Sequence, residues 1–237
     1  EIADENFLDA LGHYLATLPM PVVVVHGGGK EISEAQERYG LTPHMVDGVR
    51  VTDARSLEIV TMVLSGLVNK RLVATFMHAG LDALGMSGAD RGIVRASKMQ
   101  HPSVDMQYSG SVSSVDAAKL IPLLQVGITP VIAPICLGDD TLFNVNADHV
   151  AGAIAGALGA ERVIFFTNVE GVLIDGQVAT TISSVQAEQY IEEGTIYGGM
   201  VPKVRTALHA LESGVSGSVI TNLDGLQTHG GTVFAQG

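Results

Sequence analysis

Residues 22 to 30 read VVVVHGGGK: four β-branched apolar residues, a histidine, three glycines and a lysine. An apolar run that ends at glycines is typical of a buried strand entering a turn, and it predicts a strand from Val22 to His26. A helix is expected to follow from about Glu31 to Tyr39. Bare glycine backbone and the partial positive charge of a helix N-terminus can together bind an anion. A glycine-rich turn that only packs fits the same pattern, so both interpretations stay open at this point.

The common nucleotide-binding and catalytic motifs do not account for this turn. The stretch HGGGKEIS lacks the G-x-x-x-x-G-K-[ST] spacing, and it fails G-x-G-x-x-G because Ile32 occupies the third glycine position. The segment GMSGA around Ser87 is not the G-x-S-x-G of serine hydrolases, because Ala89 stands last. The eight histidines include no H-E-x-x-H pair. No metal-ligating residues are therefore predicted.

Apolar runs bounded by turn residues alternate with segments of helical period along the chain. This alternation favours an α/β fold with a mainly parallel sheet covered by helices. The alanine- and glycine-rich stretch after Asp148 predicts a helix that packs closely against the sheet. The other predicted elements are helices over Asn6 to Leu18 and ending near Leu124, a hairpin turn at Asp47-Gly48, and strands over Leu84 to Met86, Ile93 to Ala96 and Thr129 to Ala133.

One long helix is predicted from about Ala54 to Ala79. Asp53 is expected to cap its first turn. Apolar residues at spacings of three and four predict a single buried face on it, made by Leu57, Val60, Leu64 and Leu67.

Composition limits the class of protein. The chain has 237 residues, of which 46% are hydrophobic and 16% charged, and this is enough for a sizeable core. No apolar run approaches the roughly 20 residues of a membrane span, and no leader peptide is recognised. The single cysteine, Cys136, excludes an internal disulfide, is expected to be buried, and fits a cytoplasmic location.

Charge argues against nucleic acid and leaves room for a small anion. The net charge is −12 and the basic residues form no dense run, so binding along a phosphate backbone is not expected. A small anionic ligand requires only that a few cations converge. The candidates are Lys30, Arg50, Lys70, Arg71, Lys203 and Arg205.

Five motifs in order resemble the amino-acid kinase family: HGGG at 26–29, GVRVTD at 48–53, FNVNAD at 143–148, TNVEGVL at 167–173 and GGMVPK at 198–203. The resemblance covers about residues 20 to 221. It implies an open, mostly parallel sheet in a three-layer α/β/α sandwich, one domain over residues 1–237. Two approximate lobes are implied, residues 1–137 binding N-acetyl-L-glutamate and residues 138–237 binding the nucleotide.

The activity implied by this resemblance is ATP-dependent phosphorylation of the side-chain carboxylate of N-acetyl-L-glutamate, in arginine biosynthesis. Gly28 and Gly29 match the glycines whose backbone contacts the substrate and the transferring phosphoryl group. Arg50 and Asn144 match the pair that holds the substrate's α-carboxylate, a task that suits a planar guanidinium.

The remaining matched positions concern the nucleotide. Lys203 matches a lysine that neutralises phosphate charge in the transition state, and Asp148 a carboxylate that orients the lysines. Mg²⁺ is expected to be held mainly by the nucleotide phosphates. The matched nucleotide loops are Thr167, Asn168, Val169, Glu170, Gly171 and Val172, with Thr195, Ile196 and Tyr197.

Some family features differ here. The family opens with a strand carrying a lysine two residues before a Gly-Gly pair, whereas this sequence starts at EIADENFLDA. We expect that further chain precedes Glu1; a degenerate member with impaired chemistry is the alternative. Gln107 stands where the family's D-x-G segment has glycine.

Two rival functions stay open. One is a kinase acting on carrier-protein-linked aminoadipate or glutamate, which typically departs from GVRVTD and NVNAD. The other is a catalytically silent amino-acid-binding regulator on the same fold. The resemblance also implies a homodimer or homohexamer, with arginine as a possible effector.

Overall fold

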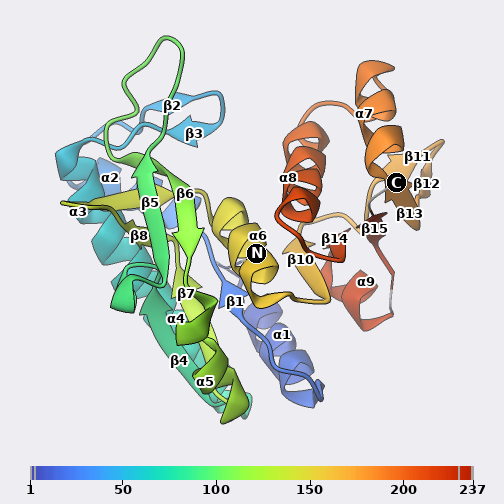
Figure 1. Cartoon of the computed structure of the whole chain (residues 1–237), viewed down its shortest axis with the longest axis horizontal. Helices are drawn as coiled ribbons and strands as arrows, with labels where there is room; N and C mark the ends of the chain where they lie inside the picture. Colours follow the sequence, from blue (N-terminus) through green and yellow to red (C-terminus); the bar gives the residue numbers. More distant parts are fainter. Residues whose placement is uncertain (1, 3, 229, 236–237) are drawn as a thin grey trace. The chain divides into compact units, whose positions relative to one another are not determined.

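The computed structural model describes residues 2, 4–228 and 230–235, and they form two compact units (Figure 1). The first unit is Ile2–Val150 and the second is Ala151–Gly237. The division falls inside helix α6 (Ala147–Leu158), later than the expected boundary between residues 137 and 138. The reason is that β8 (Ile135–Leu137) and β9 (Leu142–Val145) pair with earlier strands, so they belong to the first unit.

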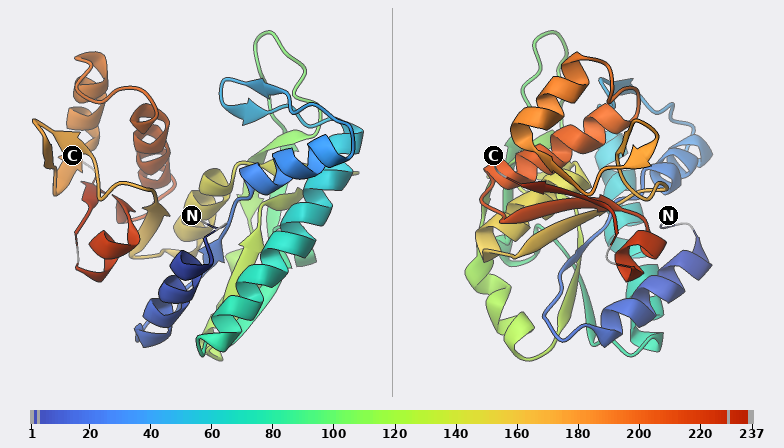
Figure 2. Two further views of the ribbon diagram at one scale, coloured as in Figure 1. Left: turned by 180° about the vertical axis from the view of Figure 1, so that it is seen from behind. Right: turned by 90° about the vertical axis from the view of Figure 1, so that its right-hand side faces the viewer.

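A parallel sheet of order β1-β7-β4 lies in the first unit, formed by β1 (Val24–Val25), β7 (Thr129–Ala133) and β4 (Ala83–Ser87). All five residues of β7 are buried, as its apolar run predicted. β1 is shorter than predicted, although His26 N–H still donates to the carbonyl of Ile132. Helix α5 (Ile121–Gln125) covers one face of the sheet and α4 (Asn69–His78) the other (Figures 1 and 2). The predicted α/β class is confirmed.

The long helix has the predicted extent but an irregular centre. It runs through α3 (Ala54–Thr61), a π-helical segment η1 (Met62–Val68) and α4, and the Asp53 carboxylate caps it by accepting from Ser56 N–H at 2.7 Å. A π turn holds more residues than an α turn, and so it rotates the following residues around the axis. Leu67 is therefore 61% exposed, against prediction, while Val68 and Leu72 are buried.

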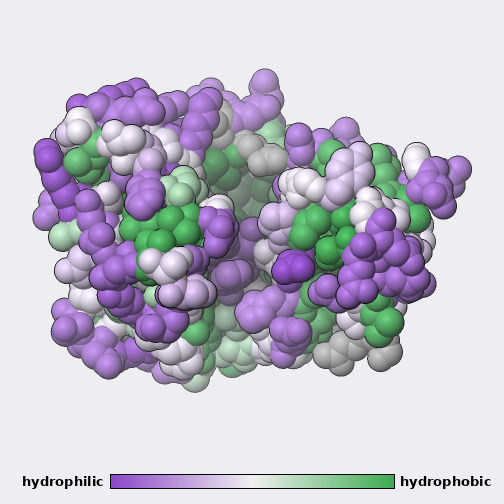
Figure 3. All heavy atoms as spheres, turned by 90° about the horizontal axis from the view of Figure 1, so that it is seen from above, coloured by the Kyte–Doolittle hydropathy of each residue, from purple (hydrophilic) through white to green (hydrophobic). Residues whose placement is uncertain are grey.

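This continuous helix, Ala54–His78, is also long and apolar enough to cross a membrane by length and composition alone. Uninterrupted apolar runs do not reveal this helix, because polar residues such as Ser65 and Asn69 interrupt its apolar sequence. Val60, Leu64 and Phe76 are nevertheless buried in the core of the first unit, as in the core helix of a soluble domain. Figure 3 shows hydrophilic residues over much of the face that it displays, with hydrophobic areas between them. The helix is thus weak evidence for a membrane span.

A small closed barrel of order β5-β6-β9-β8 completes the first unit, with β5 (Val94–Lys98) and β6 (Ser109–Val115) antiparallel. Sequence patterns predicted short strands in this region but not their closure. Cys136 on β8 is fully buried, as predicted, and burial raises the pKa of its thiol to about 12. The remaining elements of this unit are α1 (Glu5–Thr17), α2 (Gly29–Arg38), β2 (Met45–Val46), β3 (Val49–Arg50), η2 (Asp90–Gly92) and η3 (Ala117–Lys119).

The β2–β3 hairpin turns at Asp47 and Gly48, whose φ angles are 48° and 79°. Positive φ at both central residues is the requirement of a type I′ turn, so the Asp-Gly signal predicted this hairpin correctly.

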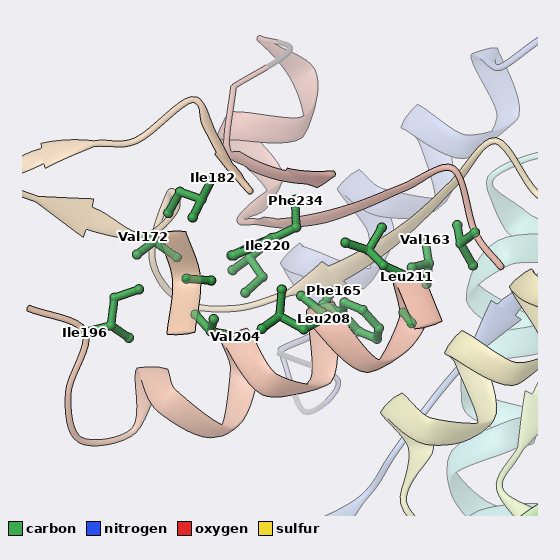
Figure 4. Close-up of a cluster of buried hydrophobic side chains, with 14 of the residues drawn as sticks. Val163, Phe165, Val172, Ile182, Ile196, Val204, Leu208, Leu211, Ile220 and Phe234 are labelled. Carbon is green, nitrogen blue, oxygen red and sulfur yellow. The ribbon is translucent and has the colours of Figure 1, made fainter. Parts of the chain in front are cut away.

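The second unit has a four-stranded sheet of order β10-β14-β15-β13, in which β14 and β15 are antiparallel and the other pairs parallel. Helix α8 (Met200–Glu212) packs on it through Val204, Leu208 and Leu211, around Phe165 and Phe234 (Figure 4). The other elements are β10 (Arg162–Phe166), β11 (Leu173–Ile174), β12 (Gln177–Val178), β13 (Thr181–Ser183), α7 (Ser184–Glu192), β14 (Gly217–Thr221), α9 (Leu223–Gln227) and β15 (Thr232–Ala235).

The small residues of α6 allow close packing against helix α8, in addition to any packing against the sheet. A Cβ at Gly156 would lie 2.0 Å from the carbonyl oxygen of Ser213, and one at Gly152 would lie 3.2 Å from Cβ of Ala210. Gly156 and Gly152 therefore let α6 approach α8 and its C-terminal cap closely.

Candidate functional site

The glycine turn joins β1 to α2, with Gly28 as the N-cap of the helix. The first helix-closing bond runs from Ile32 N–H to the Gly28 carbonyl at 2.9 Å, so the preceding N–H groups have no partner within the helix. A Cβ at Gly28 would lie 2.6 Å from Cδ2 of Leu64, whereas a Cβ at Gly29 would meet nothing within 4 Å. Packing thus accounts for Gly28, while Gly29 presents bare backbone to open space.

Arg50 lies on β3 with its guanidinium directed at the start of α2, and it is only 9% exposed. It donates to Ser33 Oγ at 2.8 Å, to the Gly29 carbonyl at 3.2 Å, and to Gln36 Oε1. Gln36 is in turn held by a hydrogen bond from its Nε2 to Ser56 Oγ at 2.9 Å. Arg50 is therefore fixed beside the glycine turn by neutral acceptors.

The charge of Arg50 has no acidic partner among the described residues, since none of their salt bridges involves it. Burial lowers the pKa of Arg50, but an arginine stays protonated near neutral pH because its ordinary pKa lies far above neutrality. A buried cation normally has an anionic partner. The arrangement therefore suits an anionic ligand.

Asn144 on β9 is linked to Arg50 through two hydroxyl residues. Its Nδ2 donates to Thr52 Oγ1 at 3.0 Å, and Thr52 N–H donates to Ser109 Oγ at 3.0 Å. Ser109 Oγ donates to the Arg50 carbonyl at 2.5 Å. The structure thus brings the predicted pair together, and it adds Thr52 and Ser109, which the sequence analysis did not select. The position of Thr52 two residues after Arg50 was the available signal, because alternate strand residues share a face.

Gln107 lies next to this network. Its φ of 53° is in the left-handed region that glycine favours, and it forms an isolated bridge with Thr52. The neighbouring Tyr108 N–H donates to the Thr52 carbonyl at 2.8 Å. The glycine that the family has at this position matches the backbone conformation seen here.

Asp148 lies in the first turn of α6, where its carboxylate is exposed. Asn146 caps this helix, with its Oδ1 accepting from Asp148 N–H at 2.8 Å. Ala147 lies beside the glycine turn, since a Cβ at Gly27 would be 3.8 Å from its Cβ. The N-terminus of α6 is thus close to that of α2, and two helix N-termini favour negative charge nearby.

Lys203 and Thr167 lie together in the second unit. Lys203, in the first turn of α8, donates from Nζ to Thr167 Oγ1 at 2.5 Å. Thr167 is 2% exposed and follows β10, and its N–H donates to the Thr221 carbonyl at 2.9 Å. Its hydroxyl in turn lies 3.3 Å from Asn168 Oδ1. A lysine ammonium is therefore held at the carboxyl end of a parallel strand, where α/β sheets bind ligands.

The other predicted nucleotide residues differ in what they can contact. Val172 and Ile196 are in the hydrophobic core (Figure 4), and Val172 N–H is taken by Thr232 Oγ1 at 2.8 Å. Gly171 is buried against Thr232 as well. Tyr197 is 76% exposed. The positions that remain accessible to a ligand are, in whole or in part, Asn168, Val169, Glu170, Thr195 and Tyr197.

Residues 3–222 match the model of the Amino acid kinase family, and the chain belongs to this family. Curated relatives include the acetylglutamate kinase of Roseiflexus castenholzii, 49% identical over 238 residues that cover 100% of this chain and 92% of the relative. The acetylglutamate kinase of Chloroflexus aurantiacus is 46% identical, over 100% of this chain and 94% of its own. Among solved structures, N-acetylglutamate synthase from Neisseria gonorrhoeae, complexed with coenzyme A and N-acetyl-glutamate, is 26% identical with a TM-score of 0.84, over 98% of this chain and 56% of that chain.

Proposed function

We propose that this chain is an acetylglutamate kinase, which transfers the γ-phosphoryl group of ATP to the side-chain carboxylate of N-acetyl-L-glutamate. The observation that carries the proposal is Arg50, a buried cation with neutral protein partners beside a bare glycine turn. A substrate carboxylate supplies the missing negative charge. Relatives that carry this enzyme name match the whole chain, which supports the same reaction.

The proposed chemistry needs no general base. A side-chain carboxylate of this kind has an unperturbed pKa of about 4.3, so the attacking group is already ionised at neutral pH. Its oxygen forms a bond to the γ-phosphorus, and the bond from that phosphorus to the oxygen of the β-phosphate breaks, its electron pair leaving with ADP. The product is an acyl phosphate. Alignment and charge neutralisation are the tasks left to the protein.

In the first unit, Arg50 and Asn144 would hold the α-carboxylate of the substrate. The Arg50 guanidinium is held by Ser33, the Gly29 carbonyl and Gln36, and the Asn144 amide donates to Thr52. The backbone N–H groups of Gly28 and Gly29 would donate to the transferring phosphoryl group at the positive end of α2.

In the second unit, Lys203 would neutralise phosphate charge, with Thr167 holding its ammonium. The family match of Asp148, in the first turn of α6, supports a role as a carboxylate that orients lysines. Val172 and Ile196 would shape the nucleotide loops from the core, while Asn168, Val169, Glu170, Thr195 and Tyr197 would face the nucleotide. Mg²⁺ would be held mainly by the nucleotide phosphates, as the family match implies.

A homodimer or homohexamer is part of the proposal. Met62 and Leu67 on the long helix are 53% and 61% exposed, and exposed apolar side chains of this kind suit an interface. Met62 lines a groove of about 870 Å³ formed by α3 and the β8–β9 turn, which also includes Leu57, Leu137 and Leu142. Light scattering on the protein and on Leu67→Glu tests it, since the substitution should yield monomers. The proposal also includes a cytoplasmic location and arginine as an effector. Both are supported by the biosynthetic role of the family.

The function is tested by ADP release with Mg-ATP and each of three acceptors: N-acetyl-L-glutamate, N-acetyl-aspartate and free glutamate. Turnover with acetylglutamate alone is expected. Turnover only with a carrier-linked aminoadipate or glutamate would replace the proposal by the carrier-dependent kinase. Binding of acetylglutamate without any ADP release would favour the silent regulator.

A further inference from the structure

His26 is a buried polar residue to which the proposed function gives no task. It lies between β1 and the glycine turn and is 3% exposed. Its Nδ1 is 2.9 Å from the Gly27 carbonyl oxygen, and its Nε2 is 3.1 Å from Nδ2 of Asn69. Both ring nitrogens therefore have partners inside the protein.

The orientation of the Asn69 amide is set by its other contacts. Its Oδ1 accepts from Lys70 Nζ at 2.9 Å, and its Nδ2 donates to the Val131 carbonyl at 2.8 Å. A weaker contact joins Nδ2 to the Met86 carbonyl at 3.3 Å. A reversed amide would place Oδ1 against these carbonyls. The NH₂ group must therefore face His26.

This orientation decides the tautomer of His26. An amide NH₂ can only donate, so Nε2 of His26 has to accept from Asn69. The ring proton then resides on Nδ1, which donates to the Gly27 carbonyl. Burial lowers the pKa of His26, and Arg71 and Lys70 lower it further, whereas Gly27 and Glu31 raise it; burial has the largest effect, which agrees with a neutral ring.

The bond to Gly27 also fixes the next amide. In a planar trans peptide the carbonyl and the N–H point in opposite directions, so holding the Gly27 carbonyl directs the Gly28 N–H away from His26. The long helix that carries Asn69 also contacts Gly28 directly. A Cβ at Gly28 would lie 2.6 Å from Leu64 Cδ2 and 3.4 Å from Val68 Cγ2. Leu64 and Val68 belong to the π-helical segment, and Asn69 follows it immediately.

We propose that His26 and Asn69 are positioning residues for phosphoryl transfer, which hold the Gly27–Gly28 peptide so that the Gly28 N–H faces the transferring group. The proposal rests on the proposed function. Neither side chain touches the substrate; each acts through the backbone of the glycine turn.

Two substitutions of His26 separate its two hydrogen bonds. In His26→Asn the amide nitrogen can take the place of Nδ1 and keep the bond to Gly27, while the contact with Asn69 is lost. In His26→Gln the amide oxygen can take the place of Nε2 and keep the contact with Asn69, while the bond to Gly27 is lost. Matched controls are His13→Asn and His13→Gln, because His13 is exposed on α1.

Steady-state kinetics and thermal unfolding are measured on all four variants of the full chain. His26→Gln is expected to lower kcat about tenfold or more, since small misplacements of aligned groups cost such factors, with KM for acetylglutamate within about twofold. His26→Asn should stay closer to the wild-type kcat. Equal loss of kcat in both His26 variants, in step with equal losses of Tm, would mean a merely structural role and overturn the proposal, as would unchanged kcat in His26→Gln.

A measurement that needs no turnover keeps this inference separate from the proposed function. Nitrogen-15 chemical shifts of the His26 ring at neutral pH should report a proton on Nδ1 alone. A proton on Nε2 or a charged ring would overturn the positioning role even in an active enzyme. Absence of ADP release by the wild-type chain with the Nδ1 tautomer present would refute the kinase proposal and, with it, the catalytic purpose given to His26.

Discussion

Lys203 and Thr167 are joined by a 2.5 Å hydrogen bond from Nζ to Oγ1, which ties the first turn of α8 to the end of β10. The bond places an ammonium group at a strand end and restricts its motion. An aligned charge of this kind stabilises a transition state more than a mobile one, because it needs no reorganisation during the reaction.

Lys203→Ala should therefore reduce kcat far more than it changes either KM. The expected loss is about 10²-fold or more, on the order of 3 kcal/mol, as for other preorganised charge stabilisers. Arg205→Ala is the matched control, because Arg205 is an exposed cation on the same helix. Steady-state kinetics with both substrates varied measures the effect, and wild-type kcat in Lys203→Ala would remove Lys203 from the catalytic role.

Thr167→Val should lower kcat by a smaller factor, because it removes the acceptor that holds Lys203 but leaves the charge in place. Losing one such hydrogen bond to a charged group corresponds to about 1.5–3 kcal/mol. Thr167→Ser keeps the hydroxyl and should restore most of the activity. If the serine and valine variants have the same kcat, the hydroxyl does not position Lys203.

Arg50→Ala should raise KM for acetylglutamate at least about tenfold, since a hydrogen bond to a charged group contributes about 1.5–3 kcal/mol. Arg50→Lys keeps the charge without the planar fork and should give an intermediate KM. Arg55→Ala serves as control, because Arg55 is exposed on the neighbouring α3. An unchanged KM in Arg50→Ala would show that the carboxylate binds elsewhere.

The two glycines of the turn should respond differently to alanine. Gly28→Ala should destabilise the fold by about 1–3 kcal/mol, because its Cβ would collide with buried Leu64. Gly29→Ala meets no neighbour and should leave Tm nearly unchanged, yet lower activity by placing a methyl group where the phosphoryl group approaches. Thermal unfolding together with kinetics separates the two effects. A Gly29→Ala variant with full activity would argue against this side of the turn as the binding face.

Gln107→Gly should stabilise the protein by about 0.5–1 kcal/mol. The left-handed conformation costs a residue with a Cβ about 1–2 kcal/mol, and the greater chain entropy of glycine offsets part of the gain. Gln100→Gly is the control in the same loop, where φ is negative, and it should be neutral or destabilising. Denaturant unfolding would contradict the strain argument if both substitutions shifted the midpoint alike.

Local signals in the sequence predicted the elements that depend on them. Asp47-Gly48 was correctly placed in a type I′ turn because its geometry requires residues tolerant of positive φ, and strand β7 because a short apolar run fits a strand buried on both faces. The exposure of Leu67 could not be foreseen, since helical periodicity assumes a constant number of residues per turn.

Only some of the residues of the candidate site could be predicted from the sequence. Arg50 and Asn144 were selected through the family resemblance, and the structure links them. The connecting residues Thr52 and Ser109 depend on a long-range contact between the segment after β3 and the start of β6, which brings residues 57 positions apart within hydrogen-bond distance. No local pattern reports such a contact. The contact of Gln36 with Arg50 is also long-range, so the sequence predicted Gln36 only as part of a helix.

The π-helical segment Met62–Val68 also sets the rotation of the residues that follow it around the helix axis, and so determines which way Asn69 faces. Each residue advances an α-helix by about 100°, and a π turn holds about one residue more than an α turn, so regular α winding of the same residues would turn Asn69 away from His26. Substitutions that favour regular α winding in this segment should therefore disturb the polar contacts of Asn69, although they leave Asn69 itself unchanged.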